Sequence, residues 1–383
     1  RPTRSTLFPY TTLFRSEHDG HIYAAKNKSP LLLGTGKEGI ILASDVMAMV
    51  GYANQYYPIE DKTFTSVQKL ADGVYDFDVC DIIGHPITPK FLKIDLVLDE
   101  IGKAGYDHFM LKEICEQPSV VRKIMSKYLD QDRILLDESI LSQIRQAERI
   151  YILAAGTSMH AGFVGKYLFK HLSAIPTEVF IASEFAYNQP LLVKKPFFIF
   201  ISQSGETADL RACLVNVKAL GHPTLTITNV ATSTLAREAS MFLEIHAGPE
   251  IAVASTKAYV GQIMILTILS FALSNQKLFD LHMELSRVAI AMEAIIDNRD
   301  YVQRLVKQHF TKRNCFYIGR GLDYYTCLEA ALKLKEISYI QTEGFAAGEL
   351  KHGTIALIED GVPVIAIISQ SNKIGRASCR ERV

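Results

Sequence analysis

A chain of 383 residues is long enough to bury more than one hydrophobic core, so two or three compact domains are expected. Its 41 basic and 41 acidic residues cancel, which leaves no net field to attract a nucleic-acid backbone or an anionic membrane, and we expect neither as a partner. The 6 cysteines form no CxxC pair or Cys/His cluster, so they indicate neither disulfides nor a metal site and favour a reducing, cytoplasmic setting.

The two ends of the chain differ from the rest. Residues 1–16 contain a near repeat of Thr-Leu-Phe and match neither a signal peptide nor a transit sequence. Together with residues 374–383 they are expected to be foreign, adaptor-like sequence. The natural domains are therefore expected between residues 17 and 373.

Residues 17–118 contain short β-rich runs, at 21–25, 30–33 and 74–83, separated by Gly, Pro and Asp. This pattern predicts a β-layered domain. Residues 34–39 match the dinucleotide motif GxGxxG, but a further strand follows them instead of a helix. We therefore expect a tight turn between strands there.

Residues 119–136 are charged and helical in pattern and are predicted to form a linker. After them, short apolar strands alternate with longer helical stretches, which predicts doubly wound, parallel-sheet α/β domains. We expect a near-complete one at 137–280 and part of a second at 306–373. The apolar run 258–273 is too short to span a bilayer and is interpreted as a buried helix.

An internal repeat indicates two copies of one fold. In each copy an apolar strand leads into a glycine-containing turn and a helix, and a later strand ends in Ser-Gln-Ser. The matched segments are 149–158 with 315–321, 182–185 with 347–350, and 196–204 with 363–371. The second copy is expected to stop at Lys373, just after its second strand.

The loop Ser202-Gln203-Ser204-Gly205-Glu206-Thr207 lies between a predicted buried strand at 195–201 and a predicted amphipathic helix at 208–220. Such a turn offers backbone N–H groups, the positive end of a helix dipole and hydroxyl donors, which suit a phosphate. It has no lysine and so is not a nucleotide P-loop. The alternative is an ordinary helix cap, because Ser, Thr and Glu are also the residues of capping boxes.

A second loop favours the phosphate hypothesis. Thr157 and Ser158 also follow an apolar strand and open a helix, so both loops are expected at the carboxyl edge of one sheet, where doubly wound folds bind ligands. A third segment, 253–257, begins the long apolar helix and is positioned to close the site.

In the second copy, Glu329, Lys333 and Glu336 share one face of a predicted helix. The alternative for this group is a solvated helix face carrying a Glu-Lys pair. A glycine-rich segment containing His352 follows. A carboxylate and an imidazole that converge on a sugar can transfer protons beside a carbonyl and open the ring, which is a pattern for isomerisation.

Six motifs occur in the order found in the glucosamine-6-phosphate synthases, the glutamine:fructose-6-phosphate aminotransferase (isomerizing) family, which the chain resembles from about residue 17 to 373. They are ILASD at 41–45, KEICEQP at 112–118, SQSGETAD at 202–209, VASTKA at 253–258, LEAALKLKEISYI at 328–340 and AAGELKHG at 346–353.

The resemblance implies a two-part enzyme. An N-terminal αββα glutaminase of the Ntn type, of which residues 17–118 would be the C-terminal part, releases ammonia from glutamine. Two SIS (sugar isomerase) domains then convert fructose 6-phosphate and ammonia into glucosamine 6-phosphate, the first step towards UDP-N-acetylglucosamine. The family uses no metal or organic cofactor. Its members are typically homodimers, in which the histidine loop reaches the sugar of the neighbouring subunit.

The resemblance also assigns roles to residues. The phosphate and sugar hydroxyls would be held by hydroxyl and amide side chains, and Val253 and Ser255 would close over the substrate. Glu336 would move a proton between C1 and C2, His352 would assist ring opening, and Glu329 and Lys333 would support them. The residues that would hold the substrate are Thr157, Ser158, Ser202, Gln203, Ser204 and Thr207. In the N-terminal part, Asp45 matches the aspartate that recognises the amino group of glutamine.

The chain also departs from the family pattern. Arg1 stands where the family has a cysteine nucleophile with a free α-amine, and the C-terminal lysine-bearing tail is not matched. We therefore expect this chain not to complete the synthase reaction. Two alternatives remain: another SIS enzyme, such as a deglycase or ketose isomerase, which has no need of the motifs at 41–45 and 112–118, and a non-catalytic phosphosugar regulator, which has no need of Glu336 or His352.

Overall fold

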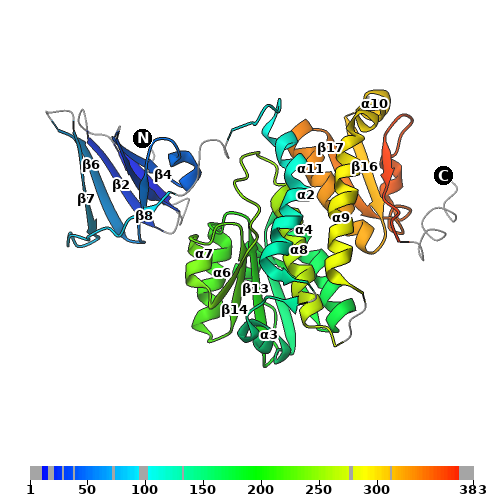
Figure 1. Cartoon of the computed structure of the whole chain (residues 1–383), viewed down its shortest axis with the longest axis horizontal. Coiled ribbons are helices and arrows are strands. Elements are labelled where there is room, and N and C mark those ends of the chain that lie inside the picture. Colours follow the sequence, from blue (N-terminus) through cyan, green and yellow to red (C-terminus); the bar gives the residue numbers. More distant parts are fainter. Residues whose placement is uncertain are drawn as a thin grey trace. The chain divides into compact units, whose positions relative to one another are not determined.

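The computed structural model describes most of the chain, in two compact units, Arg1–Gly105 and Tyr106–Val383, each of which is treated by itself (Figure 1). The described residues are 11–15, 21–27, 30–37, 39–70, 74–94, 102–131, 133–275, 279–310 and 313–370. The segment 374–383 that was expected to be foreign lies outside them. Of residues 1–16, only 11–15 are described.

The first unit is built from two antiparallel sheets, as the β-rich pattern predicts. One has the strand order β1-β2-β6-β7 and the other β4-β3-β5-β8. Their strands are β1 (Thr11–Arg15), β2 (His21–Asn27), β3 (Leu32–Gly36), β4 (Gly39–Ala43), β5 (Gln55–Pro58), β6 (Thr63–Lys69), β7 (Tyr75–Asp81) and β8 (Leu92–Lys93), with the short 3-10 helix η1 (Val46–Met49) after β4. Apolar side chains, Leu33, Tyr57 and Val67 among them, form the core.

Two details of this unit bear on the sequence predictions. Gly36 pairs with Gly39 across β3 and β4, so the GxGxxG match is a turn between strands, as predicted. β1, inside the segment expected to be foreign, pairs with the edge of β2. Edge pairing uses backbone groups alone and does not depend on a particular sequence.

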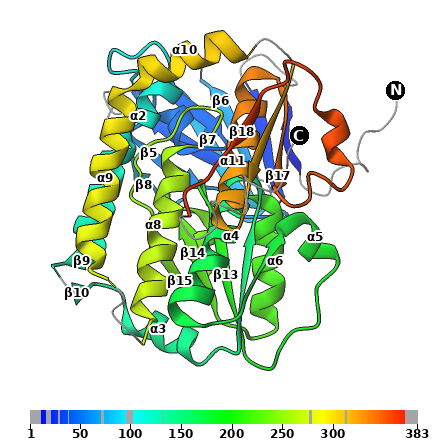
Figure 2. The ribbon, with the colours of Figure 1, turned by 90° about the vertical axis from the view of Figure 1, so that its right-hand side faces the viewer.

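The second unit begins with α2 (Phe109–Tyr128), the short hairpin β9 (Leu129–Asp130) and β10 (Arg133–Ile134), and α3 (Glu138–Arg145). The predicted boundary at residue 118 and the predicted linker 119–136 fall within this region. In the structure, α2 is one continuous helix whose apolar side belongs to the core of the second unit. It runs beside α8 (Lys257–Ala272) and α9 (Leu281–Asp297) in Figures 1 and 2.

The main sheet is parallel, with the strand order β12-β11-β13-β14-β15, which is a doubly wound order. Its strands are β11 (Arg149–Ala154), β12 (Thr177–Ile181), β13 (Pro196–Ser202), β14 (Thr224–Thr228) and β15 (Met241–Glu244). The helices between them are α4 (Gly156–Leu168), extended by the π-helical turn η2 (Phe169–Ser173), α5 (Ala182–Tyr187), α6 (Ala208–Ala219) and α7 (Thr234–Glu238).

Both faces of this sheet are covered, as expected for a parallel sheet. Phe198 and Phe200 of β13 pack with α5, α6 and α7 on one face, whereas Ile199 and Ile201 pack with α2, α4, α8 and α9 on the other. Figure 2 shows α8 and α9 on one side and α5 and α6 on the other. Successive side chains of a strand point to opposite faces, so a strand buried on both faces must be continuously apolar.

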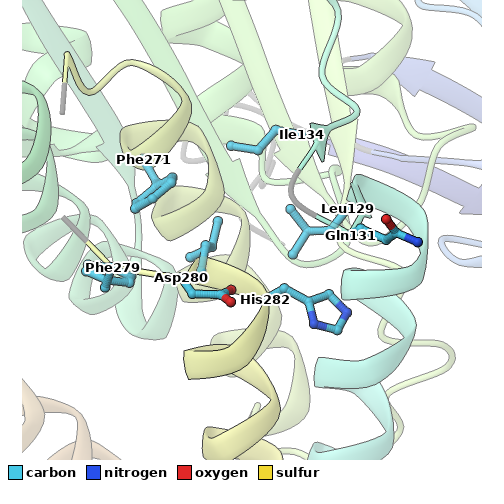
Figure 3. Close-up of a pocket in the computed structure, with 8 residues that line it drawn as sticks. Leu129, Gln131, Ile134, Phe271, Phe279, Asp280 and His282 are labelled. Atoms are coloured by element: carbon cyan, nitrogen blue, oxygen red, sulfur yellow. The ribbon is translucent and has the colours of Figure 1, made fainter. Parts of the chain in front are cut away.

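A cavity of about 450 Å³ opens where α2 ends and α9 begins (Figure 3). Leu129 and Ile134 lie on one side and Phe271, near the end of α8, on another. Since α8 rises about 1.5 Å per residue, this cavity is roughly 20 Å from the beginning of that helix.

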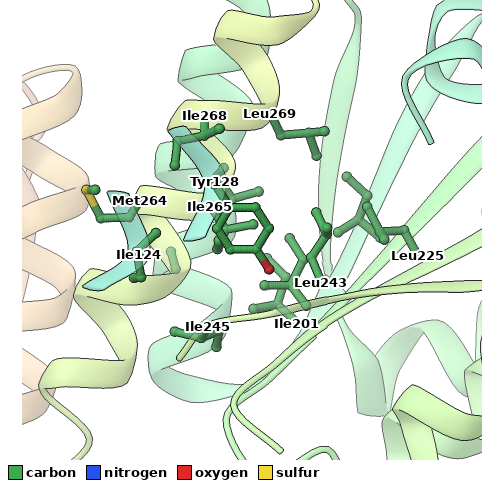
Figure 4. Packing of buried hydrophobic residues seen from close by; sticks show 14 of the residues in the cluster. Ile124, Tyr128, Ile201, Leu225, Leu243, Ile245, Met264, Ile265, Ile268 and Leu269 are labelled. Atoms are coloured by element: carbon green, nitrogen blue, oxygen red, sulfur yellow. The ribbon is translucent and has the colours of Figure 1, made fainter. Parts of the chain in front are cut away.

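The larger core of the second unit lies between the sheet and α2 and α8. Figure 4 shows Ile124 and Tyr128 of α2 with Ile265 and Ile268 of α8, packed over Ile201 at the end of β13. Tyr128 also donates its hydroxyl to the carbonyl of Glu244 at 2.8 Å. Burial, and to a lesser extent the negative charge of Glu244, raises the pKa of Tyr128 to about 12. Its phenol therefore stays protonated and can keep that bond. α2 is thereby fixed to the sheet beside the carboxyl ends of β13 and β15.

The second copy follows α9 and α10 (Arg299–His309) and begins with β16 (Asn314–Gly319). It continues with α11 (Leu322–Ser338), β17 (Gln341–Ala346), the 3-10 helix η3 (Thr354–Leu357) and β18 (Val364–Ala366). Its sheet order, β17-β16-β18, repeats β12-β11-β13 of the first copy, which supports the internal repeat. The prediction of two strands was wrong, since the described part of this copy has a third, β17. Its sequence, QTEGFA, lacks the continuous apolar run by which a buried strand is recognised.

No helix in the described ranges combines the length and the apolar character needed to cross a bilayer. The described residues also hold no group of three or more His, Cys, Asp or Glu side chains placed to bind a metal ion.

Candidate functional site

The candidate site begins with two loops at one edge of the main sheet. β11 and β13 are neighbours, with Ala154 opposite Ile201. Because both strands run in the same direction, the loops that follow them leave the sheet side by side. One carries Thr157 and Ser158 at the start of α4, and the other is residues 202–207 before α6. The predicted meeting of the two loops at the carboxyl edge is therefore found.

The loop 202–207 is organised by its own hydroxyl groups. The Ser202 hydroxyl accepts the N–H of Gly205 at 3.0 Å and lies 3.0 Å from the Thr207 hydroxyl. Ser204 accepts the N–H of Glu206 at 3.2 Å. Thr207 occupies the N-cap of α6 without a side-chain cap bond, so the capping alternative does not describe this loop.

Glu206 has a separate task. Its carboxylate accepts the N–H of Thr234 at 2.7 Å and so caps α7, the neighbouring helix. Its carboxylate is therefore engaged by that helix. The N-terminus of α6, which has no side-chain cap, and the hydroxyls of the loop remain, a combination that favours an anion.

A hydroxyl has one proton and two lone pairs. Ser204 uses its oxygen to accept a backbone N–H, and Ser158 accepts the amide of Gln262 at 2.9 Å. In the part of the chain that the structure describes, neither hydroxyl proton is used in a hydrogen bond. Both can therefore donate to an added acceptor without breaking an existing bond.

Gly205 sets the shape of this loop. It has φ +67°, in the left-handed region that glycine tolerates best. A Cβ atom there would lie 2.0 Å from the Ser233 hydroxyl oxygen and 2.4 Å from the Ser233 Cβ. The glycine is therefore required both by the backbone angle and by close packing against the start of α7.

Lys333, on α11 of the second copy, reaches the first copy. Its ammonium donates to the Thr157 hydroxyl at 2.7 Å, and it pairs with Glu336 at 2.7 Å and with Glu329 at 3.4 Å. The side chains of Glu329, Lys333 and Glu336 are 7%, 15% and 31% exposed. The alternative of a solvated helix face is thus wrong for this group.

Glu329 has a second partner that the sequence analysis did not identify. His160, on α4, lies with its Nδ1 2.7 Å from the Glu329 carboxylate, and both side chains are buried. Burial raises the pKa of Tyr259 on α8, and the negative charge of Glu329 raises it further. α4, α8 and α11 therefore meet around one buried carboxylate beside the loop of Thr157.

The segment 249–256, which leads into α8, is held by carboxylates. Glu250 accepts the N–H of Thr256 at 2.8 Å and of Ala258 at 3.1 Å, and the Ser255 hydroxyl donates to it at 2.8 Å. Val253 is 95% exposed. The structure thus places Ser255 next to the start of α8, whereas it does not bring Val253 into contact with the two loops.

Two other predicted residues, His352 and Asp45, stand apart from this cluster, and Gln203 belongs to the loop 202–207. His352 is exposed in the turns after β17, and its ring makes no hydrogen bond or ion pair within the described ranges. Gln203 is half-buried, and its carbonyl accepts the N–H of Asn229 at 3.0 Å. Asp45 is exposed before η1 in the first unit.

The residues missed by sequence reasoning are His160, Gln262, Glu250 and Glu113. For the first three, the sequence pattern does not indicate a functional role. For Glu113 on α2 a signal was available, because it is seven residues before Val120 and eleven before Ile124 and shares their buried stripe. A glutamate in an apolar stripe predicts a buried partner.

Comparisons with known proteins agree with this geometry. The model of the SIS domain matches residues 143–272 and 310–374. Glutamine--fructose-6-phosphate aminotransferases [isomerizing] of Geobacillus kaustophilus and Bacillus subtilis are 51% and 50% identical over 363 and 366 residues, which is 93% and 94% of this chain. The chain spans 60% of the length of these curated relatives.

Solved structures are also similar to much of this chain. The C-terminal domain of glucosamine-fructose-6-phosphate aminotransferase from Francisella tularensis is 35% identical, with a TM-score of 0.66, over 72% of this chain and 80% of that chain. A putative phosphosugar isomerase from Silicibacter pomeroyi has a TM-score of 0.59 at 23% identity, over 70% of this chain and 80% of that chain. At that identity the likeness concerns the fold alone.

Proposed function

Because the chain belongs to the SIS domain family and is homologous to the glutamine–fructose-6-phosphate aminotransferases, we propose that it binds fructose 6-phosphate at the loop 202–207. We propose further that the whole protein converts this sugar, with the nitrogen of glutamine, into glucosamine 6-phosphate and glutamate. The observation that carries the proposal is Lys333, whose ammonium joins the Thr157 hydroxyl of the first copy to the Glu336 carboxylate of the second.

The phosphate has a suitable place at the two loops. The hydroxyls of Ser158 and Ser204 each have a proton to donate, and Ser202 and Thr207 share one hydrogen bond, which leaves one further proton. The beginnings of α4 and α6 add the partial positive charge of two helix dipoles. Gln203 and Thr157 follow β13 and β11 and lie at the same edge of the sheet. These groups bind a dianion by oriented dipoles, while the charge of Lys333 is shared with Glu329 and Glu336.

The reaction requires two changes at neighbouring carbons. Ammonia condenses with the C2 carbonyl to an imine and releases water. A proton then moves from C1 to C2, and the C1 hydroxyl proton passes to the nitrogen, which leaves an aldehyde at C1 and an amine at C2. Glu336 is the proposed carrier of that proton. Lys333 holds its carboxylate at 2.7 Å, and Glu329, fixed by His160, holds Lys333. His352 would assist ring opening from the neighbouring subunit of a homodimer, since within the described part of one chain its ring makes no hydrogen bond to the other site residues.

The first unit is proposed to be the C-terminal part of an Ntn-type glutaminase. Its two antiparallel sheets support this assignment, and Asp45, after β4, is the proposed recognition residue for the amino group of glutamine. The site is proposed to work without a metal or organic cofactor, in the cytoplasm.

Calorimetric titration tests the phosphosugar site. Fructose 6-phosphate is expected to bind the chain, and the double change Ser204→Ala with Thr207→Ala is expected to abolish binding, because two donors are lost together. Ser286→Ala is a matched control, since Ser286 makes an exposed hydroxyl-to-carbonyl bond within α9, and should leave the affinity unchanged. Unaltered titration of the double variant would argue against the assigned loop.

A further inference from the structure

The segment 249–256 is held from outside as well as by Glu250. It joins β15 to α8, and apart from turns and bends it contains no helix or strand. Glu113, on the second turn of α2, accepts the N–H of Ile251 at 2.6 Å and of Ala252 at 3.0 Å with one carboxylate oxygen. These two residues immediately precede Val253. α2 therefore determines where this segment lies.

Position 113 is an unusual one for a glutamate, because the residue there is only 2% exposed. Its second carboxylate oxygen is buried without a hydrogen bond among the described residues. An unpaired buried carboxylate oxygen costs free energy, and the two strong bonds from the backbone amides offset that cost. An apolar residue would fill the same stripe of α2 at lower cost, so the glutamate indicates a requirement beyond packing.

A second pair of charges fixes the far end of the segment. Lys257, the first residue of α8, is buried and donates to Glu116 of α2 at 2.7 Å. Lys112 lies 3.6 Å from the same carboxylate. Glu113 and Glu116 are on neighbouring turns, so two turns of α2 hold residues 251–257 at both ends.

The position of α2 gives this attachment a consequence. The helix begins at Phe109, directly after the division between the two compact units at Gly105. Its other end is fixed by the Tyr128 hydroxyl to Glu244. The helix that follows the first unit in the chain is therefore also the support of the segment beside the candidate site.

We propose that Glu113 is a positioning residue that holds residues 251–255 over the sugar portion of the phosphosugar site. The identity of the ligand and its contact with residues 251–255 rest on the proposed function, whereas the attachment of the segment to α2 does not. The role of Glu113 concerns the sugar, because the phosphate is assigned to the loops at 157–158 and 202–207. Loss of Glu113 therefore weakens the binding of a phosphosugar more than that of inorganic phosphate.

Three variants test the proposal: Glu113→Ala, Glu113→Gln and the control Glu293→Gln. Glu293 pairs with Arg122 of α2 at 2.7 Å on the exposed side, so this control removes a contact of the same helix with no effect on the segment. Hydrogen exchange of the ligand-free chain is the first readout. In Glu113→Ala, amides 251–256 should exchange about 10- to 100-fold faster, as expected for loss of a bond to a charged group. Glu113→Gln keeps an acceptor oxygen and should show a smaller change.

Titrations with fructose 6-phosphate and with inorganic phosphate form the second readout. Glu113→Ala should weaken fructose 6-phosphate more than tenfold and phosphate less than twofold, with partial rescue in Glu113→Gln. Equal losses for both ligands, or unchanged exchange at 251–256, would overturn the proposal. If the unaltered chain binds neither ligand while the exchange result holds, the proposed function fails and the placement of the segment by Glu113 stands.

Discussion

Gly205→Ala is a sharp perturbation of the candidate site, because two separate costs can be worked out for it. The left-handed backbone, φ +67°, costs a non-glycine residue about 1–2 kcal/mol. The added Cβ would lie 2.0 Å from the Ser233 hydroxyl oxygen, and relief of such overpacking costs about 1–3 kcal/mol more. The sum predicts a loss of roughly 2–5 kcal/mol in the free energy of unfolding.

Gly221→Ala separates the two costs. Gly221 has φ +76°, but a Cβ there meets nothing within 4 Å. It should therefore lose only about 1–2 kcal/mol. Urea unfolding of both variants, followed by the helical circular dichroism of the second unit, measures the difference in their free energies of unfolding. Adding Ser233→Gly to Gly205→Ala should recover part of the loss, because it removes the closest atoms. Equal destabilisation by Gly205→Ala and Gly221→Ala would refute the tight packing of the loop.

Three further results are expected. Lys333→Met should reduce the free energy of unfolding by about 3 kcal/mol, because it removes the cation that pairs with both Glu329 and Glu336, whereas Lys335→Met, exposed on the same helix, should change it by under about 0.5 kcal/mol; equal urea midpoints would contradict the pairing. Burial raises the pKa of Cys213 to about 12, so iodoacetamide at pH 8 should label it only after unfolding, as mass spectrometry can determine. The hydrogen bond from Arg122 lowers the pKa of Glu293; its stabilisation should be present above about pH 4.3 and disappear as the pH falls through the lowered pKa, so Glu293→Gln should be less stable than the unaltered chain at pH 7 and equal to it at pH 2.

Much of the fold follows from apolar patterns. β13 is continuously apolar because both of its faces are covered, and such a run predicts a central parallel strand. Its neighbour β11 has the same pattern, and the turns after both strands follow from their common direction. The meeting of Thr157 with residues 202–207 at one edge was therefore predictable without coordinates.

Other features depend on tertiary contacts that sequence patterns do not contain. β17 is polar in sequence and becomes a strand because β16 offers it a parallel partner. The spacing of Glu329, Lys333 and Glu336 predicts a shared helix face but does not show whether that face is solvated. Its burial against α4 follows from the packing of one copy on the other.

The loop 202–207 illustrates the same limit at atomic scale. Its composition suits both a helix cap and an anion site, and the structure distinguishes them because Thr207 contacts Ser202 and does not cap α6. Glu113 shows the reverse case. Its position in an apolar stripe is visible in the sequence, but its partners lie 138 and 139 residues away.

The central claim is that Glu336 moves a proton at C1 of a sugar held by the loop 202–207. The most direct measurement is deuterium incorporation at C1 of fructose 6-phosphate in D₂O with added ammonium chloride, followed by NMR with the unaltered chain and with Glu336→Gln. The unaltered chain should incorporate deuterium, and Glu336→Gln should bind the sugar with similar affinity but exchange at least about 100-fold more slowly. Exchange at equal rates in the two proteins, with binding intact, would contradict the account.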